Sequence, residues 1–187
     1  MTEQQRQQQI IHWIEQDAMR MLALRTVKQL ALPDWCLAAG FVRNLVWDRL
    51  HDFSQSSPLN DIDVIYFDAQ DISVQSEKEA EQRLSTLAEL PWSVKNQAKM
   101  HLLHDHAPYS SSSESMSYWV ETETVIGATL NHLGQVELVA PLGSAALFEF
   151  SITANPRHGD PNVMLERARS KGWLTQWPKL SVVDHIR

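Results

Sequence analysis

Apolar residues recur every three or four positions along several parts of the chain, as they do on the buried face of an α-helix. The N-terminal set consists of Ile10, Ile11, Ile14, Ala18, Met21 and Leu22. Pro33 and Asp34 follow this set, so we predict a helix over residues 3–30. The same spacing predicts helices over residues 41–50 and 77–90, and shorter ones over 141–150 and 161–172.

Short apolar or alternating runs separate these helices and predict strands over residues 35–39, 61–67 and 92–101. A hairpin is expected where residues 124–131 and 135–140 flank a turn at 132–134. The serine-rich stretches 51–59 and 110–117 are typical of surface loops. A strand–helix–strand start followed by a hairpin predicts an α+β (mixed α/β) fold, in which helices flank a mixed central sheet.

Length and composition predict one domain over residues 1–187, with helical residues 1–32, a core at 33–150 and a C-terminal helix and tail at 151–187. The net charge of −7 disfavours a broad nucleic-acid footprint, although a local basic patch stays open. Cys36 is the single cysteine, so no intramolecular disulfide is expected. The polar N-terminus and the lack of a run of roughly 20 apolar residues predict no membrane span and a cytoplasmic location.

Asp61 and Asp63 are the most informative polar residues of the chain. They stand two apart in a predicted strand, so both carboxylates leave the sheet on the same face. Carboxylate oxygens of this kind are the ligands that Mg²⁺, or Mn²⁺, prefers. Gly40 lies just upstream, where a turn opens a helix whose N–H groups can bind a phosphate; the plain alternative is a strand–helix turn. Together these residues predict an enzyme that holds a metal-bound nucleoside triphosphate.

Two-metal phosphoryl transfer usually needs a third acid, and Glu137 is the best candidate. It interrupts the apolar run 136–140, where an acid is costly unless it is paired or binds a metal. The alternative is an exposed residue on an edge strand. Glu121 and Glu123 are reserve candidates near the start of the preceding predicted strand.

Three further residues are candidates for nucleotide binding. Arg43 lies one helical turn past Gly40, from where it can reach a phosphate or pair with Asp48. Lys95 and Asn96 belong to a strand expected beside the aspartate pair. They contact the triphosphate or the base in one interpretation, and form a plain exposed strand face in the other.

The segment Ala39-Gly-Phe-Val-Arg-Asn44, followed by Asp61-Ile-Asp63, resembles the head of the DNA polymerase β-like nucleotidyltransferase superfamily. It is most similar to the Gly-Gly-x-Val-Arg-Asp and Asp-x-Asp motifs of tRNA CCA-adding enzymes and bacterial poly(A) polymerases. From residue 35 onward the chain also resembles a family of small bacterial nucleotidyltransferase-like proteins, through residues 39–48, 60–68, 92–101, 140–143 and 177–180.

This resemblance implies a nucleotidyltransferase fold, Mg²⁺ on Asp61 and Asp63, and a triphosphate near Ala39 and Gly40. Glu137 would match the acid of the third strand. The chain departs from the motif at Ala39, where the family has a glycine, and at Asn44, where it has an aspartate. The RNA-binding helical domains of CCA-adding enzymes have no counterpart in the 187 residues, which argues against a tRNA acceptor.

The function expected from these features is Mg²⁺-dependent transfer of a nucleoside monophosphate from a nucleoside triphosphate to an acceptor, with release of pyrophosphate. A small molecule, a protein side chain and an RNA end all stay open as acceptors. The alternative is a non-catalytic nucleotide- or metal-binding regulatory protein on the same fold, because the glycine pair is incomplete.

Overall fold

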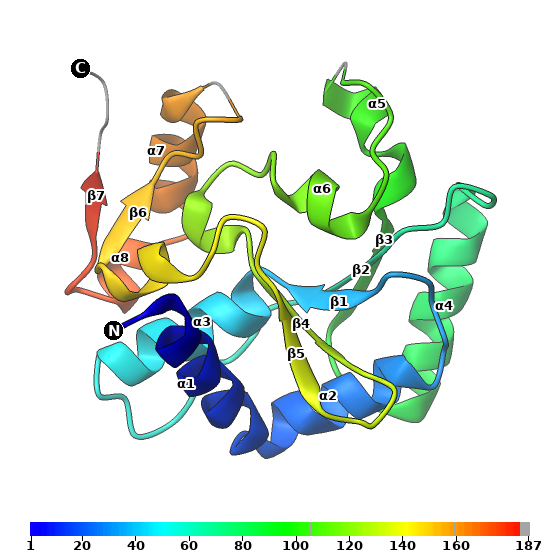
Figure 1. Ribbon diagram of the computed structural model, residues 1–187, viewed down its shortest axis with the longest axis horizontal. Coiled ribbons are helices and arrows are strands. Elements are labelled where there is room, and N and C mark those ends of the chain that lie inside the picture. The colour runs from blue at the N-terminus through cyan, green and yellow to red at the C-terminus, as the bar shows by residue number, and fades with distance from the viewer. Residues whose placement is uncertain (105, 159, 184–187) are drawn as a thin grey trace.

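A five-stranded mixed sheet lies at the centre of the protein (Figure 1). The computed structural model describes residues 1–104, 106–158 and 160–183. The strands are β1 (Cys36–Ala38), β2 (Ile62–Tyr66), β3 (Trp92–Asn96), β4 (Gly127–Leu130) and β5 (Val136–Val139), ordered β3-β2-β1-β4-β5. β2 and β3 run parallel, and the other neighbours run antiparallel. The predicted α+β fold is therefore confirmed.

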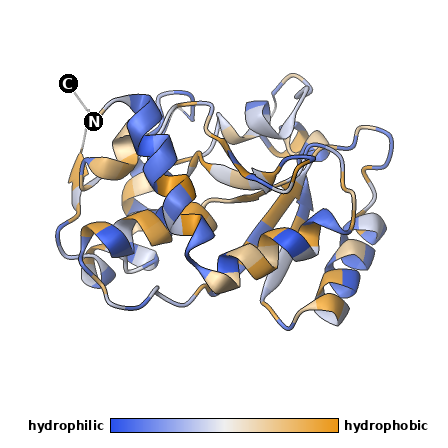
Figure 2. Cartoon of the chain, turned by 60° about the horizontal axis from the view of Figure 1, so that its bottom comes forward, coloured by the Kyte–Doolittle hydropathy of each residue, from blue (hydrophilic) through white to orange (hydrophobic). Residues whose placement is uncertain are grey.

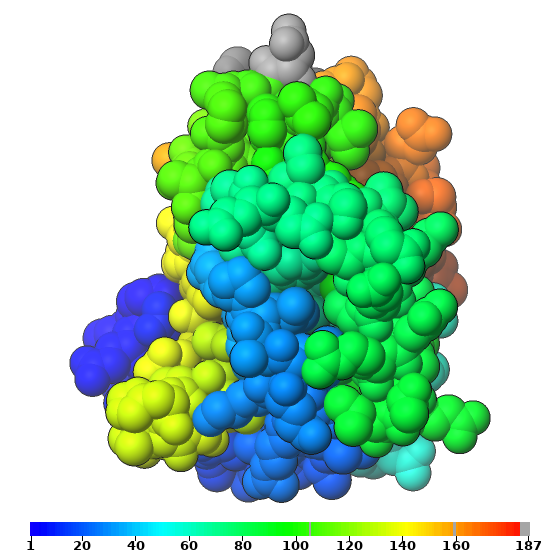
Figure 3. Space-filling model, turned by 90° about the vertical axis from the view of Figure 1, so that its right-hand side faces the viewer, coloured from blue at the N-terminus to red at the C-terminus, as the bar shows by residue number. Residues whose placement is uncertain are grey.

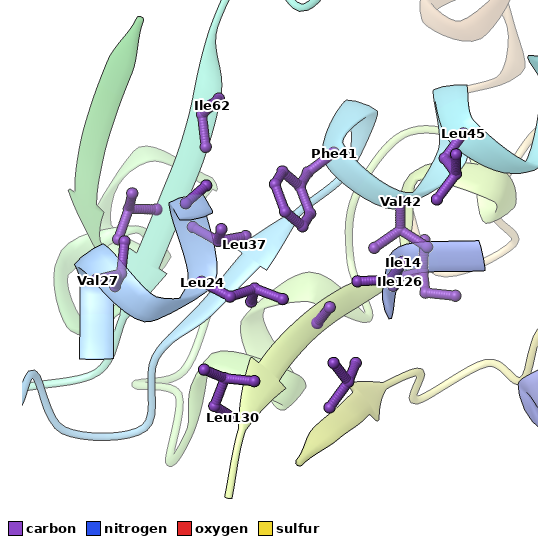
Figure 4. Packing of buried hydrophobic residues seen from close by; sticks show 14 of the residues in the cluster. Ile14, Leu24, Val27, Leu37, Phe41, Val42, Leu45, Ile62, Ile126 and Leu130 are labelled. Atoms are coloured by element: carbon purple, nitrogen blue, oxygen red, sulfur yellow. The ribbon is translucent and has the colours of Figure 1, made fainter. Parts of the chain in front are cut away.

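Four helices cover one face of this sheet: α1 (Glu3–Glu15), α2 (Ala18–Lys28), α3 (Gly40–Leu50) and α4 (Val74–Leu87). α1, α2 and α4 carry apolar residues on one side and polar residues on the other, and Figure 2 shows such two-sided helices, whereas α3 is buried along most of its length. The main core forms where their apolar sides meet the strands, and Figure 4 shows Leu24, Phe41 and Val42 packing there against Leu37 and Ile126. Burial of these side chains is the main favourable term in folding.

The predicted helix over residues 3–30 is two helices, because Asp17 ends the first one and caps the second. Its side chain accepts a hydrogen bond from the backbone N–H of Arg20 at 3.0 Å. Short acidic side chains favour this cap position over a helix interior. The break lets α1 and α2 pack on different parts of the sheet, α1 against β5 and α2 against β4.

The end of one strand and the content of one predicted loop also differ from the prediction. β3 ends at Asn96, whose side chain accepts a hydrogen bond from the N–H of Ala98 and starts the turn η1 (Gln97–Lys99) before α5 (His101–His104). The predicted serine-rich loop holds α6 (Ser112–Met116), which Ser111 caps through the N–H of Glu114. Serine side chains here start helices, because their oxygens satisfy first-turn N–H groups. Figure 3 shows the green surface of residues around 100–115 above that of residues 65–90.

The C-terminal segment forms a small second unit of packing. It comprises β6 (Ser151–Thr153), α7 (Pro161–Ser170), α8 (Trp173–Gln176) and β7 (Ser181–Val183), and β6 pairs with β7 in parallel. This pair was not predicted, because each strand has only three residues. The apolar cluster of this segment is built around a side chain of α3, and it contains Trp47, Ile152, Met164, Ala168, Trp173, Trp177 and Leu180. Residues 184–187 of the predicted tail lie outside the described residues.

A buried carboxylate ties the C-terminal segment to α3. Asp48, only 1% exposed, accepts hydrogen bonds from Trp177 Nε1 (2.8 Å), the Ser57 N–H (2.7 Å) and the Ser57 hydroxyl (2.6 Å). No helix within the described ranges is long and apolar enough to cross a membrane.

Candidate functional site

Asp61 and Asp63 lie at the start of β2, on the face of the sheet that turns away from the main core. Ile62 and Val64 alternate with them and are fully buried in that core. Burial raises the pKa of Asp63, and the negative charge of Asp61 raises it further, whereas the positive charge of Arg43 lowers it. The predicted convergence of the two carboxylates therefore creates a site where a cation would relieve their repulsion.

The pair has the chemistry of a divalent cation site. No ion pair within 4.0 Å joins either carboxylate to a cation in the described ranges, so both are available to a metal. Those ranges also contain no group of three or more acidic, histidine or cysteine residues with metal-binding geometry. Mg²⁺ is commonly held by one or two carboxylates and completes its octahedral shell with phosphates and water. Two aspartates therefore fit Mg²⁺ or Mn²⁺ that arrives with a phosphate-bearing ligand.

The turn between β1 and α3 is held in an unusual backbone conformation. Ala39, the N-cap of α3, has φ 50° and ψ −114°, a region that residues with a Cβ rarely adopt. Its N–H donates to the carbonyl of Ile126 at 2.8 Å, and its carbonyl accepts a hydrogen bond from the backbone N–H of Arg43 at 2.9 Å. Arg20, buried in α2, donates through Nε to the carbonyl of Phe41. The first turn of α3 is thus fixed beside the aspartates, and no side chain in the described part of the chain caps it.

Replacing Ala39 with glycine should stabilise the protein. Glycine adopts a positive φ without the clash that a Cβ causes. The strain removed from the folded state exceeds the stability lost because glycine makes the unfolded chain more flexible. We therefore expect the free energy of unfolding to rise by about 0.5–1 kcal/mol. The measurement is denaturant unfolding of the A39G variant. Ala23→Gly, inside α2, is the matched control and should instead lose about 1 kcal/mol or more. A loss in A39G would contradict the assigned strain.

Arg43 is buried and held between two tryptophans. Its guanidinium carbon lies 4.2 Å from the ring centroid of Trp173 and 5.0 Å from that of Trp47. Nη2 donates to the Asn44 side chain at 2.9 Å. Burial lowers the pKa of Arg43 to about 10, which leaves it protonated at neutral pH. The alternative pairing with Asp48 is not found, because Asp48 binds Ser57 and Trp177 instead.

A cavity of about 420 Å³ brings most of the candidate residues together. The predicted residues that line it are Ala39, Gly40, Arg43, Asp61, Asp63 and Lys95. Aromatic and histidine side chains also line it, among them Tyr109, Tyr118, Trp119, His104 and His158. Natural small-molecule sites are of this size and combine apolar walls with a few polar groups.

Glu137 does not join the aspartates, and this expectation is corrected. It is exposed on the edge strand β5, which β4 and β1 separate from β2, and it accepts a hydrogen bond from Asn131 Nδ2 at 2.9 Å. An acid interrupts the apolar run because this position of the edge strand faces outward.

Asn96 has a structural place and does not line the cavity. It is fully buried, and its amide donates to the carbonyls of Asp68 and Asp71 while its oxygen accepts from the N–H of Asp68. The side chain therefore fixes the chain after β2 to the end of β3. The expectation that Asn96 contacts a nucleotide is corrected.

Three more charged residues line the cavity: Glu121, a reserve candidate, and Arg167 and Lys171, which were not predicted. Glu121 is 1% exposed and accepts a hydrogen bond from Arg167 Nε at 2.6 Å. Glu121 was a reserve candidate for the third acid, but its carboxylate forms an ion pair with Arg167. Arg167 and Lys171 stand four residues apart, and this spacing on a predicted helix is the sequence signal that could have singled them out.

Glu123 is buried, and its carboxylate oxygen Oε1 has no hydrogen-bond partner among the described residues. Its other oxygen accepts from the N–H of Thr153 at 3.0 Å, and burial raises the pKa of Glu123 to about 7. The folded protein therefore keeps a proton at Glu123 between pH 4.5 and about 7, where the unfolded chain has lost it. The free energy of unfolding must fall as pH rises through this window.

Glu123→Gln should remove this part of the pH dependence, because glutamine stays neutral. We expect the wild type to lose on the order of 2 kcal/mol more than the variant between about pH 5 and about pH 8. Denaturant unfolding of both proteins at the two pH values measures the difference. Parallel losses in the two proteins would contradict the assignment.

The comparisons with known proteins agree with this fold. A family model described as a nucleotidyltransferase matches residues 25–182, and the chain belongs to this family. A protein whose NMR structure reveals a CCA-adding enzyme head domain shares 31% identity with the chain, with 95% of each chain covered and a TM-score of 0.80.

A tRNA-processing enzyme complex shares the fold at 16% identity and a TM-score of 0.52, over 86% of this chain and 43% of the other. No match was found among curated proteins. The predicted resemblance to the DNA polymerase β-like nucleotidyltransferases and the CCA-adding head is thus confirmed.

Proposed function

We propose that the protein transfers a nucleoside monophosphate from a metal-bound nucleoside triphosphate to an acceptor and releases pyrophosphate. The observation that carries this proposal is that Asp61, Asp63, the β1–α3 turn and several cations line one and the same cavity. Family membership supports nucleotidyl transfer in general. A cytoplasmic location stays a prediction.

Each group has a separate task in this proposal. Asp61 and Asp63 would hold Mg²⁺ or Mn²⁺, which neutralises charge on the phosphates and activates the attacking oxygen when bound. The first turn of α3, at Ala39 and Gly40, would bind phosphate oxygens through its N–H groups. Arg43 and Lys95 would add positive charge along the phosphate chain. Positioning and charge neutralisation would supply most of the rate enhancement.

The reaction balances without any further cofactor. An acceptor oxygen bonds to the α-phosphorus while the bond from that phosphorus to the pyrophosphate oxygen breaks. Pyrophosphate leaves with the bonding electron pair, and the proton of the acceptor hydroxyl passes to solvent. The relative with the CCA-adding head domain makes an RNA 3′ end one acceptor to try, beside small hydroxyl compounds and protein side chains.

One observation favours a second function, a non-catalytic nucleotide- or metal-binding regulator. The described residues place only two carboxylates together, without the third acid that two-metal transfer usually employs. In that case the protein would bind the metal nucleotide and never release pyrophosphate.

Radioactive nucleotides labelled at two different positions distinguish these functions. The purified protein is incubated with Mg²⁺ and each nucleoside triphosphate, labelled at the α- or the γ-phosphate, beside RNA ends and mixtures of small acceptors. Nucleotidyl transfer moves the α-label onto an acceptor and puts the γ-label in pyrophosphate. If the protein binds the nucleotide tightly but both labels stay on the intact triphosphate with every acceptor, the result favours the regulator. Transfer of the γ-label to an acceptor would overturn both.

A further inference from the structure

We propose that the C-terminal segment supplies the second wall of the phosphate site, with Arg167 and Lys171 binding the β- and γ-phosphates of the nucleotide. This inference rests on the proposed function. It names residues outside the two sequence motifs, which span residues 39–44 and 61–63. Both side chains line the cavity that holds Asp61 and Asp63. Figure 1 shows α7 on the side of the sheet opposite the helices α1 and α2.

The arrangement of Arg167 leaves part of its guanidinium available. Nε binds the buried carboxylate of Glu121 at 2.6 Å, while neither Nη donates to another residue in the described ranges. The side chain is 41% exposed, so these two nitrogens are not sealed in the core. An arginine fixed through Nε presents its two terminal nitrogens as a planar fork, the geometry that suits phosphate oxygens.

Lys171 is the second cation of this wall. It caps the end of α7, one helical turn after Arg167, and no carboxylate of the described residues lies within ion-pair distance of its ammonium. Lys171 lines the same cavity as Asp61 and Asp63. Its ammonium can therefore act on a phosphate chain that begins at the metal.

The charge balance of the cavity favours a polyphosphate over a neutral ligand. Four cations line it, namely Arg43, Lys95, Arg167 and Lys171. The carboxylates are Asp61, Asp63 and Glu121, and the first two are the ones a divalent metal would neutralise. With the metal bound, the wall keeps an excess of positive charge that a triphosphate satisfies.

The C-terminal segment also orients the cation that α3 contributes. Trp173 of α8 covers the guanidinium of Arg43 at 4.2 Å, and Trp47 of α3 lies on the same side chain. One packed unit thus fixes Arg43, Arg167 and Lys171 together. This explains why the α3 helix is buried on two sides, against the main core and against the C-terminal cluster.

Binding of three ligands tests the inference: Mg²⁺ pyrophosphate, a non-hydrolysable nucleoside triphosphate and the matching nucleoside monophosphate, each measured by calorimetry. Lys171→Gln should weaken the binding of pyrophosphate and of the triphosphate about tenfold, because it removes one charge-assisted hydrogen bond. The affinity for the monophosphate should stay within about twofold of the wild type. Arg167→Gln should act in the same direction. Arg169→Gln is the matched control, because it removes the same charge from the exposed side of the same helix.

The outcomes separate this inference from the proposed function. If Lys171→Gln and Arg167→Gln bind all three ligands like the wild type while a variant of the aspartate pair loses them, the phosphate wall is wrong and the function stands. If the variants lose as much affinity for the monophosphate as for the triphosphate, the assignment to the β- and γ-phosphates is also overturned. If the wild type binds none of the ligands, both proposals fail. Because Lys171 makes no ion pair in the described structure, its variant should fold normally.

Discussion

Replacement of both Asp61 and Asp63 with asparagine should reduce nucleotidyl transfer by roughly 1,000-fold or more, while the protein keeps its fold. The two carboxylates are the ligands proposed for the metal, and removing them leaves the developing phosphate charge uncompensated. Stability should not fall, because burial and the charge of Asp61 already raise the pKa of Asp63 and oppose its ionised form. Initial rates of α-label transfer and denaturant unfolding measure the two effects.

Glu137→Gln is the matched control for this experiment. Glu137 is an exposed acid on β5, outside the cavity, so its neutralisation should leave the rate within about twofold. Wild-type rates in the double aspartate variant would show that the chemistry lies elsewhere. A large loss in the Glu137 variant would restore the sequence-based interpretation of that residue.

Trp47→Ala should cost about 3–5 kcal/mol of the free energy of unfolding. Trp47 is fully buried, and its ring makes edge contacts with Trp173 at 5.7 Å and Trp177 at 5.1 Å. It is the side chain through which α3 enters the C-terminal cluster. A loss of this size is a large part of the 5–15 kcal/mol that typically stabilises a domain.

Denaturant unfolding measures the effect, and limited proteolysis shows where it acts. The segment from residue 151 onward should become sensitive to protease before the central sheet does. Trp47→Phe keeps part of the aromatic packing and should lose roughly half as much. A loss below about 1 kcal/mol in the alanine variant would mean that the C-terminal segment does not depend on α3.

Local sequence pattern was sufficient to place Asp61 and Asp63 on one face of the sheet and to find the turn that lines the same cavity. Asp61 and Asp63 follow from strand alternation, and the turn at Gly40 follows from one glycine between a strand and a helix. The main core helices and the five central strands were also predicted, because their periodicity is strong. Boundaries moved where a single side chain intervened, as Asp17 does between α1 and α2.

The third acid could not be chosen from the sequence. Glu137 interrupts an apolar run, but only the strand order shows that β5 is an edge and that Glu137 faces outward. Asn96 posed a similar problem, since its partners are backbone groups of the chain after β2. Arg167 and Lys171 reach the cavity only because the C-terminal segment packs on Trp47. These relations are tertiary, and the four-residue spacing of Arg167 and Lys171 indicates only that the two cations share a helix face.

Paramagnetic broadening by Mn²⁺ in NMR spectra tests the central claim most directly, because it locates the metal without requiring an acceptor. In the presence of a non-hydrolysable nucleoside triphosphate, substoichiometric Mn²⁺ should first broaden the amide signals of residues 60–63 and 39–41, and the double aspartate variant should lose this pattern. Broadening centred on β5 around Glu137, or no selective broadening at all, would contradict a metal nucleotide held by Asp61 and Asp63.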